Sequence, residues 1–410
     1  MSKGTIIVLG GTLPHAKLIS YLKEEGYRTV LIDYTENPVA KPFADRHVQE
    51  SSLDLDAVER IAREENALYI MDICTDRAIP PAAYVAEKLG LKHPYSYHTA
   101  KMATNKGLMK QFFMDNGIPS SDFLCVGEVP AESDVNLQYP LIVKPVDASG
   151  SIGITEVDSY EGLAAAVNFA IENSADHKAI IEEYIVGMEI QIDCFVVDSE
   201  LKIFDIKEKR KFTDKFLTLS YGSLVPARIS DVVKQNVITV CKNIASSIKI
   251  QNGPIYIQAL VRGEEIFVIE FGLRFGGKLS FQIIKDLTGF DVIKGTANAY
   301  VGKTVDTIRD YIEDEVYTTH HVFPKAGVFK AVVGYEPLVA DGTISDFKVY
   351  MKPNTTCLGK MASRERLASF ILRSKDMAEN DAKMRKILQN VEVLDVNDVP
   401  IMRKDIYEIE

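Results

Sequence analysis

Short apolar runs alternate with amphipathic segments over residues 1–90. The pattern predicts strands over Thr5 to Leu9, Tyr27 to Ile32 and Tyr69 to Cys74, and helices over residues 16–25, 55–65 and 81–89. Strands that alternate with helices are typical of βαβ units, so this segment is expected to form a parallel sheet. The turn at Gly10 and Gly11 lacks the GxGxxG spacing, which excludes a dinucleotide fingerprint.

The middle of the chain changes to a mixed pattern. A helical stretch over residues 99–116 precedes a strand over 139–145, a Ser/Gly-rich loop over 148–153 and a second strand over 154–157. Further elements are expected at residues 160–173 (helix), 179–181, 190–197 and 201–206 (strands) and 231–248 (helix), with an α+β segment from about residue 306. The loop has no GK[ST], so it is no Walker A element; its N–H groups could close over phosphates as a hairpin flap, or it is an ordinary Gly-rich turn.

Two apolar runs flank Gly263, Glu264 and Glu265, and this pattern predicts a hairpin centred on Glu264. In that register Gln258 opposes Glu270. Facing residues lie roughly 5 Å apart at Cβ, close enough for their side-chain oxygens to share Mg²⁺. If the strand continues, Arg274 lies on the same side as Glu270, a grouping that suits phosphoryl transfer. The alternative is a simple ion pair at a strand end.

Composition and charge narrow the class of protein. The chain has 410 residues, 46% hydrophobic and 26% charged, which excludes collagen-like, disordered and disulfide-scaffold proteins. Its formal charge of -11 disfavours nucleic acid and anionic membranes as partners but leaves small anions such as nucleotides open. No signal-peptide pattern or apolar stretch of about 20 residues is present, so a cytoplasmic protein without a membrane span is expected. Five scattered cysteines and the adjacent His320 and His321 do not suggest a zinc site.

The candidate residues form an ordered set along the chain. Lys106, Lys144, the Ser/Gly-rich loop, Glu182 to Ile185, Glu189, Gln258 and Glu270 to Arg274 occur in the order and approximate spacing of the ATP-grasp superfamily. The chain resembles an ATP-grasp ligase of the biotin carboxylase-like and carbamoyl-phosphate synthase-like branch over essentially its whole length. The resemblance implies a mixed α/β and α+β fold: an N-terminal parallel βαβ (pre-ATP-grasp) domain over residues 1–96, a connecting helical segment over 97–120, a mobile lid subdomain over 121–184, and a C-terminal subdomain with an α+β extension over 185–410.

The same resemblance implies roles for the nucleotide-binding residues. Lys106 and Lys144 look like the lysines that hold the α- and β-phosphates of ATP, and the flap would contribute Ser149, Gly150, Ser151 and Gly153. Glu182 resembles the acceptor for the adenine amino group, completed by the Glu183 carbonyl and the Ile185 N–H. Glu189 resembles the ligand of the ribose hydroxyls. The alternative for these carboxylates is a surface acidic cluster.

The residues near the hairpin would carry the chemistry. Glu270 would bridge Mg²⁺, Gln258 would be a weaker ligand, and Arg274 would stabilise charge on an acyl phosphate. One departure from the family pattern is Gly272, where Asn is most often found. Glycine offers no side-chain oxygen, so a metal ligand is lost or replaced there.

These features favour an ATP-dependent carboxylate-amine ligase, of the L-amino acid ligase type, that forms an acyl phosphate and joins it to an amine. Its partners would be small-molecule carboxylates and amines, and a homodimer is possible. A bicarbonate-activating carboxylase and a degenerate ATP-binding protein remain as alternatives. The basic run from Lys207 to Leu217 is expected as an exposed loop, in which Lys207, Arg210 and Lys211 could hold the γ-phosphate or the acid.

Overall fold

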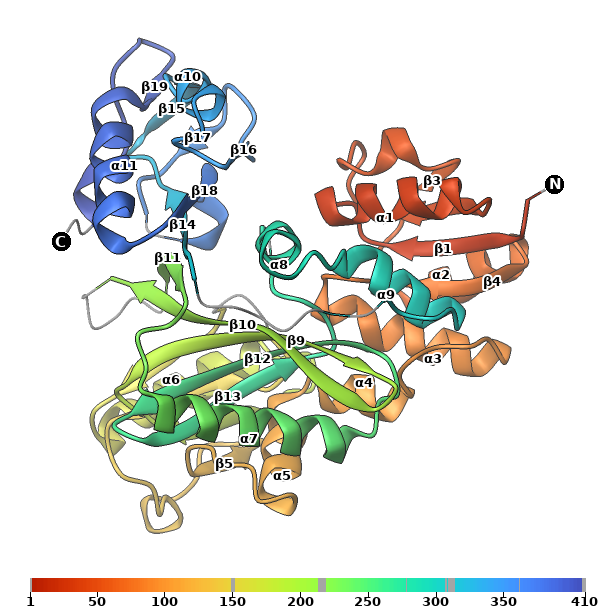
Figure 1. Ribbon diagram of the computed structural model, residues 1–410. Helices are drawn as coiled ribbons and strands as arrows, with labels where there is room; N and C mark the ends of the chain where they lie inside the picture. The colour runs from red at the N-terminus through yellow and green to blue at the C-terminus, as the bar shows by residue number, and fades with distance from the viewer. Residues whose placement is uncertain are drawn as a thin grey trace. The chain divides into compact units, whose positions relative to one another are not determined.

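The computed structural model describes residues 2–148, 152–212, 219–277, 279–306, 308, 314–360 and 362–407. Its helices and strands are drawn in Figure 1. Contacts divide the chain into two compact units. The first comprises Met1–Gly187, Gln191–Asp205 and Ile229–Tyr311, and the second comprises Met188–Ile190, Ile206–Arg228 and Ile312–Glu410. The domain boundaries expected from the sequence at residues 96, 120 and 184 stay predictions.

The first unit begins with a four-stranded parallel sheet of order β3-β2-β1-β4. The elements here are β1 (Thr5–Leu9), α1 (Leu13–Glu24), β2 (Arg28–Ile32), β3 (Arg46–Val48), α2 (Leu55–Glu64), β4 (Ala67–Met71) and α3 (Ile79–Leu89). Side chains of a strand alternate between two faces, so Ile6 and Val8 pack in one core with α1, while Ile7 and Leu9 pack in another with α2 and α3. The expected parallel sheet is confirmed.

Two helices from much later in the chain complete the first of these cores. They are α8 (Ser280–Thr288) and α9 (Val292–Val301), and α9 contacts both α1 and β4 (Figure 1). Ile284, Ile293 and Tyr300 are buried there, and the Tyr300 hydroxyl donates to the Asp72 carbonyl at 2.8 Å. The end of the first unit is therefore fixed to its N-terminal sheet.

A second sheet of the first unit is antiparallel, of order β5-β8-β6-β7. Its strands are β5 (Phe123–Val126), β6 (Leu141–Pro145), β7 (Thr155–Val157) and β8 (Ala179–Glu183), and α6 (Tyr160–Glu172) covers one face. Leu141, Val143 and Ile181 point into the core with α6. By the strand period of two, Lys144 and Glu182 point to the opposite face. This alternation places both charged residues on the face where the site is formed.

The remaining strands of the first unit form a row of order β13-β12-β9-β10. They are β9 (Met188–Val197), β10 (Glu200–Lys211), β12 (Gly253–Arg262) and β13 (Glu265–Gly272), and α7 (Asp231–Ile248) contacts β12 and β13. The start of β9 and the end of β10 belong to the second unit. There β10 pairs with β11 (Ser220–Val225), which is followed by β14 (Val316–Val322), β18 (Ala368–Ser374) and β16 (Asp346–Val349).

The second unit also contains a small three-stranded sheet of order β17-β15-β19. Its elements are β15 (Gly327–Val333), α10 (Glu336–Ala340), β17 (Thr356–Cys357), α11 (Met377–Asn390) and β19 (Glu392–Asp395). One core joins Phe329, Val393 and Ile387 to Phe370 of β18. The α+β segment expected near the C-terminus is present.

Two sequence predictions need correction. The stretch over residues 99–116 is not one helix but two, α4 (Tyr97–Met102) and α5 (Lys106–Asp115), because the Asn105 side chain accepts the Leu108 N–H at 3.1 Å and starts a new helix. The basic run is not an exposed loop over Lys207 to Lys211: these residues continue β10, and Lys207 is 2% exposed. The backbone of residues 208–211 pairs with β11, and charged side chains of the strand have partners: Lys211 forms an ion pair with Glu189, and Glu208 forms one with Arg228. Residues 213–217 of this run lie outside the described residues.

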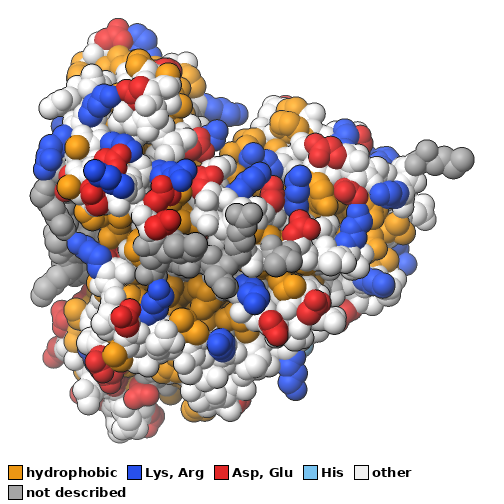
Figure 2. All heavy atoms as spheres, viewed as in Figure 1, with side chains coloured by type: hydrophobic (Ala, Val, Ile, Leu, Met, Phe, Trp, Pro, Cys, Tyr) orange, Lys and Arg blue, Asp and Glu red, His pale blue; other side chains and the backbone are white. Residues whose placement is uncertain are grey.

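Charge is distributed without segregation on the face shown in Figure 2, where Lys and Arg side chains are interspersed with Asp and Glu. Within the described ranges, no helix is long and apolar enough to cross a membrane.

Candidate active site

Helix α5 presents two lysines to the antiparallel sheet. Lys106 and Lys110 are one helical turn apart, on the same face as the buried Met109 and Phe113. The Lys110 ammonium lies 2.8 Å from Glu182 Oε2 and donates to Ser121 Oγ at 2.8 Å. Lys110 and Ser121 are neighbours of the candidate site that the sequence pattern did not single out. The spacing of four from Lys106 was the available signal for Lys110.

Glu182 is the charged centre of this group. Ile142 of β6 faces Glu182 of β8, so Lys144 is its diagonal neighbour, and the Lys144 ammonium donates to Glu182 Oε1 at 2.8 Å. Ser121 Oγ also donates to Glu182 Oε2, at 2.8 Å. Burial alone would raise the pKa of Glu182, but the ammonium groups of Lys144 and Lys110 outweigh burial and hold this pKa well below its usual range. A buried, ionised carboxylate therefore connects α5 to the sheet.

The flap expected between β6 and β7 begins beside Lys106. The Lys106 backbone N–H donates to the Val146 carbonyl at 2.7 Å, and its ammonium donates to the Ala148 carbonyl at 2.5 Å. Burial lowers the pKa of Lys106. The flap residues Ser149, Gly150 and Ser151 lie outside the described residues. Gly153 has a positive φ of 73°, and a Cβ there would lie 2.6 Å from Pro145 Cγ, so the return of the chain into β7 requires glycine.

The chain leaves β8 through a short connection that carries the expected base-recognition groups. The Glu183 carboxylate accepts the Gln138 N–H at 2.9 Å. Among the described residues, no acceptor takes the N–H of Ile185, which is half-buried. In the second unit, Glu189 is 7% exposed and forms an ion pair with Lys211. These groups supply a free donor and an ordered carboxylate, while their expected roles toward a nucleotide stay predictions.

The hairpin of β12 and β13 brings Gln258 opposite Glu270, as the sequence pattern predicts. The turn is tighter than expected, since Arg262 pairs with Glu265, and a register shift between Gln258 and Ala259 restores the pairing. Tyr256 donates its hydroxyl to Gln258 Oε1. Burial raises the pKa of Glu270, and the positive charges of Lys106 and Arg274 only partly offset this effect.

Arg274 lies just beyond β13 and has three partners. Its Nε donates to Asp76 Oδ1 at 2.7 Å, its Nη1 donates to the Phe275 carbonyl at 2.9 Å, and its guanidinium carbon lies 4.6 Å from the centre of the Tyr256 ring. Burial would lower the pKa of Arg274, but the Asp76 carboxylate outweighs it and raises this pKa above its usual value. Asp76 was not predicted as a site residue, because no local pattern links it to Arg274.

The donor set fits a hard divalent cation. Mg²⁺ prefers oxygen ligands and is usually held by one or two carboxylates together with substrate phosphates. The side chains of Gln258 and Glu270 provide two facing oxygen donors. Burial raises the pKa of Glu270, and a neighbouring cation would stabilise the ionised form of this carboxylate. These two residues would hold the ion.

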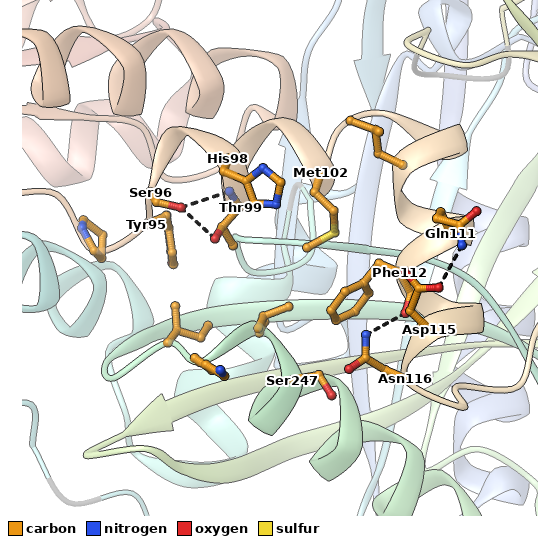
Figure 3. A pocket seen from close by; sticks show the side chains of 15 residues that line it. Tyr95, Ser96, His98, Thr99, Met102, Gln111, Phe112, Asp115, Asn116 and Ser247 are labelled. Carbon is orange, nitrogen blue, oxygen red and sulfur yellow. Dashed lines mark hydrogen bonds between the residues drawn. The ribbon is translucent and has the colours of Figure 1, made fainter.

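A separate cavity of about 650 Å³ lies on the opposite face of α5. Figure 3 shows Phe112, Gln111 and Asp115 from this helix together with Tyr95 and Met102 around it. The helical period directs these α5 side chains away from Lys106 and Lys110. The cavity contains none of the residues expected to bind nucleotide or metal.

Comparison with known proteins gives one family match: residues 137–282 match the ATP-grasp domain family. The L-arginine-specific L-amino acid ligase of Bacillus subtilis is 28% identical over 211 residues, which are 50% of this chain and 50% of that protein. The carbamoyl phosphate synthase large chain of Clostridium acetobutylicum is 24% identical over 297 residues, 69% of this chain and 27% of that protein. The chain therefore spans half the length of the first relative and 27% of the second.

Solved structures share the fold over almost the whole chain. The crystal structure of an L-amino acid ligase from Bacillus licheniformis has a TM-score of 0.78 at 18% identity, covering 96% of this chain and 99% of that one. Phosphoribosylglycinamide synthetase from Anaerococcus prevotii has a TM-score of 0.76 at 17% identity, with the same coverage. At these identities the likeness shows the fold alone. Residues 137–282 of this chain thus match the ATP-grasp domain family, and the chain as a whole shares its fold with these ligase and synthetase structures.

Proposed function

We propose that the chain is an ATP-dependent carboxylate-amine ligase. In the proposed reaction, a carboxylate oxygen of one substrate attacks the γ-phosphorus of ATP, which gives an acyl phosphate and ADP. The amine of a second substrate then attacks the acyl carbon, phosphate leaves, and an amide bond remains. The relatives named as amino acid ligases support amino acids as the first substrates to test.

One observation carries the proposal: the half-buried carboxylate of Glu270 faces Gln258. The positive charges of Lys106, Arg274 and Lys144 stabilise its ionised form and oppose the rise in its pKa that burial causes. Phosphoryl transfer depends on positioning and on stabilising charge, and this group supplies oxygen donors for a cation and cationic side chains for phosphate oxygens. A simple ion pair at a strand end would require only Arg274 and one carboxylate.

The two expected phosphate lysines retain donors for a ligand. An ammonium group has three N–H donors. Within the described part of the chain, Lys144 uses one on Glu182 and Lys106 uses one on the Ala148 carbonyl. The remaining donors would bind the α- and β-phosphates, and the Glu182 ion pair would keep Lys144 in place. Mg²⁺, when bound, would neutralise phosphate charge beside Glu270 and Gln258.

The adenosine half of ATP would lie along the connection after β8. The Ile185 N–H, which has no acceptor in the described part of the chain, is the donor for the base, with the Glu183 carbonyl beside it in sequence. Glu189 would accept the ribose hydroxyls. Arg274 would interact with the phosphoryl group during transfer, because its guanidinium is fixed and remains charged at all relevant pH values.

The test is an ADP-release screen with ATP, Mg²⁺ and pairs of amino acids and small carboxylates, with bicarbonate as one acid. Release that requires both a carboxylate and an amine supports the ligase. Release that requires bicarbonate instead supports a carboxylase. ATP binding without release across the whole panel would replace the ligase with a degenerate ATP-binding protein.

Two variants make the screen specific to this site. Glu270→Gln keeps the shape of the side chain but removes its negative charge, so release should fall to background. The matched control is Glu264→Gln, because Glu264 is exposed in the turn of the same hairpin. This variant should release ADP like the wild type.

A further inference from the structure

Gly272 is the position where this chain differs from the pattern expected for the family, and the structure shows what occupies the space above it. A Cβ built on Gly272 would lie 2.6 Å from Asp76 Oδ1, too close for any side chain unless Asp76 moved. The next atoms are Arg274 Cγ at 3.6 Å and Asp76 Cγ at 3.7 Å. The φ angle of Gly272 is not in the left-handed region, so close approach, not backbone strain, is the reason for glycine.

The oxygen that approaches Gly272 comes from a distant part of the sequence. Asp76 starts a short 3-10 helix (Asp76–Ala78) soon after the carboxyl end of β4. The carboxyl ends of strands in an open parallel sheet form the edge at which ligands bind. An asparagine side-chain oxygen lies about 2.4 Å from its own Cβ by standard bond lengths. Asp76 Oδ1, which lies 2.6 Å from the position of a Cβ on residue 272, is therefore at nearly the same distance from that position as the side-chain oxygen of an asparagine would be.

The Asp76 carboxylate holds Arg274 in one orientation. Asp76 binds Nε, the Phe275 carbonyl binds Nη1, and the Tyr256 ring covers the guanidinium face. Among the described residues, Nη2 donates to no acceptor. The contacts of Nε, Nη1 and the ring face hold the guanidinium in place, and its Nη2 N–H groups can then donate to an anionic oxygen.

We propose that Asp76 is a positioning residue of the active site, which fixes Arg274 for the transferred phosphoryl group, and that residue 272 is glycine because a side chain there would displace the Asp76 carboxylate. The proposal rests on the ligase function for the identity of the anion. It makes Gly272 an adapted position in a working site and not a mark of lost catalysis.

The geometry requires positions 76 and 272 to be coupled. Gly272→Ala should disturb Arg274 only while the Asp76 carboxylate is present. In an Asp76→Ala background the obstructing oxygen is gone, and the same substitution should have little further effect. Effects of contacting residues that are not additive in this way are measured by a double-mutant cycle.

The experiment measures binding of ADP with Mg²⁺, in the absence and presence of aluminium fluoride as a mimic of the transferred phosphoryl group, by calorimetry. Asp76→Ala and Gly272→Ala should each weaken the gain from aluminium fluoride by about 10- to 100-fold, the value of a hydrogen bond to a charged group, and leave ADP affinity unchanged. The double variant should lose no more than the single variants. Asp76→Asn, which keeps an oxygen acceptor for Nε, should lose less than Asp76→Ala.

The matched control is Gly127→Ala, because a Cβ at Gly127 would meet nothing within 4 Å. It should bind both ligands like the wild type. Additive losses in the cycle, equal losses for ADP alone, or a wild type that gains nothing from aluminium fluoride would each overturn the inference. Failure of the ligase screen together with a coupled cycle would instead refute the proposed function alone.

Discussion

Replacement of Lys110 by Met tests whether the Lys110–Glu182–Lys144 group stabilises the fold. Lys110 is 2% exposed and Glu182 is 3% exposed, and removal of one partner from a buried pair costs about 3–5 kcal/mol because it leaves a charge uncompensated. Lys144 still pairs with Glu182 in this variant, so we expect a loss near the lower limit, about 3 kcal/mol. The chain has no Trp, so unfolding in urea is followed by circular dichroism.

The exposed Arg60–Glu64 pair is the control, with side chains 51% and 46% exposed. Arg60→Met should cost about 0.3–0.5 kcal/mol, as exposed pairs one helical turn apart do. Adding Glu182→Gln to Lys110→Met should lower the stability further, because the buried Lys144 ammonium then loses its carboxylate partner. A loss below about 1 kcal/mol for Lys110→Met would refute the electrostatic account of this group.

Three further predictions concern other parts of the chain. Lys144→Met and Lys106→Met should each weaken ATP binding roughly 10- to 100-fold by calorimetry, and unchanged affinity would exclude them as phosphate ligands. Glu270→Gln should abolish Mg²⁺-dependent ADP release and leave the circular dichroism spectrum unchanged; wild-type release would exclude the metal role. Burial lowers the pKa of His320 to about 3, so between pH 6.5 and 5 only the unfolded chain gains its proton and stability should fall by about 2 kcal/mol. His320→Gln should reduce this dependence in urea titrations and leave the part that comes from His93, whose pKa burial lowers to about 4, whereas the exposed His98→Gln should keep the full dependence.

Local patterns predicted the parts of the site that are formed by neighbouring segments. The hairpin pairing of Gln258 with Glu270 follows from two apolar runs around a turn, and it holds in the structure although the turn is tighter than expected. The parallel sheet likewise follows from alternating strands and helices. In both cases the partners are adjacent in sequence or repeat a regular period, which is the information that a pattern contains.

Partners from distant segments could not be predicted in this way. Asp76 and Arg274 are separated by 198 positions, and nothing near Asp76 in the sequence distinguishes it from an ordinary turn aspartate. The same holds for Lys110, whose charge is compensated by Glu182 of another element. A charged residue suggests exposure unless its partner is known, which is also why Lys207 was wrongly expected in an exposed loop.

The acyl phosphate is the intermediate that defines the proposed reaction, and isotope transfer detects it most directly. Amino acids labelled with ¹⁸O in the carboxylate are incubated with ATP, Mg²⁺, a second amine and the protein, and the released phosphate is analysed by mass spectrometry. In the proposed reaction the carboxylate oxygen bonds to phosphorus, and the later attack of the amine breaks the bond between that oxygen and the acyl carbon. We therefore predict one ¹⁸O in each phosphate released. Phosphate without label would show that water attacks ATP directly and would contradict the ligase mechanism.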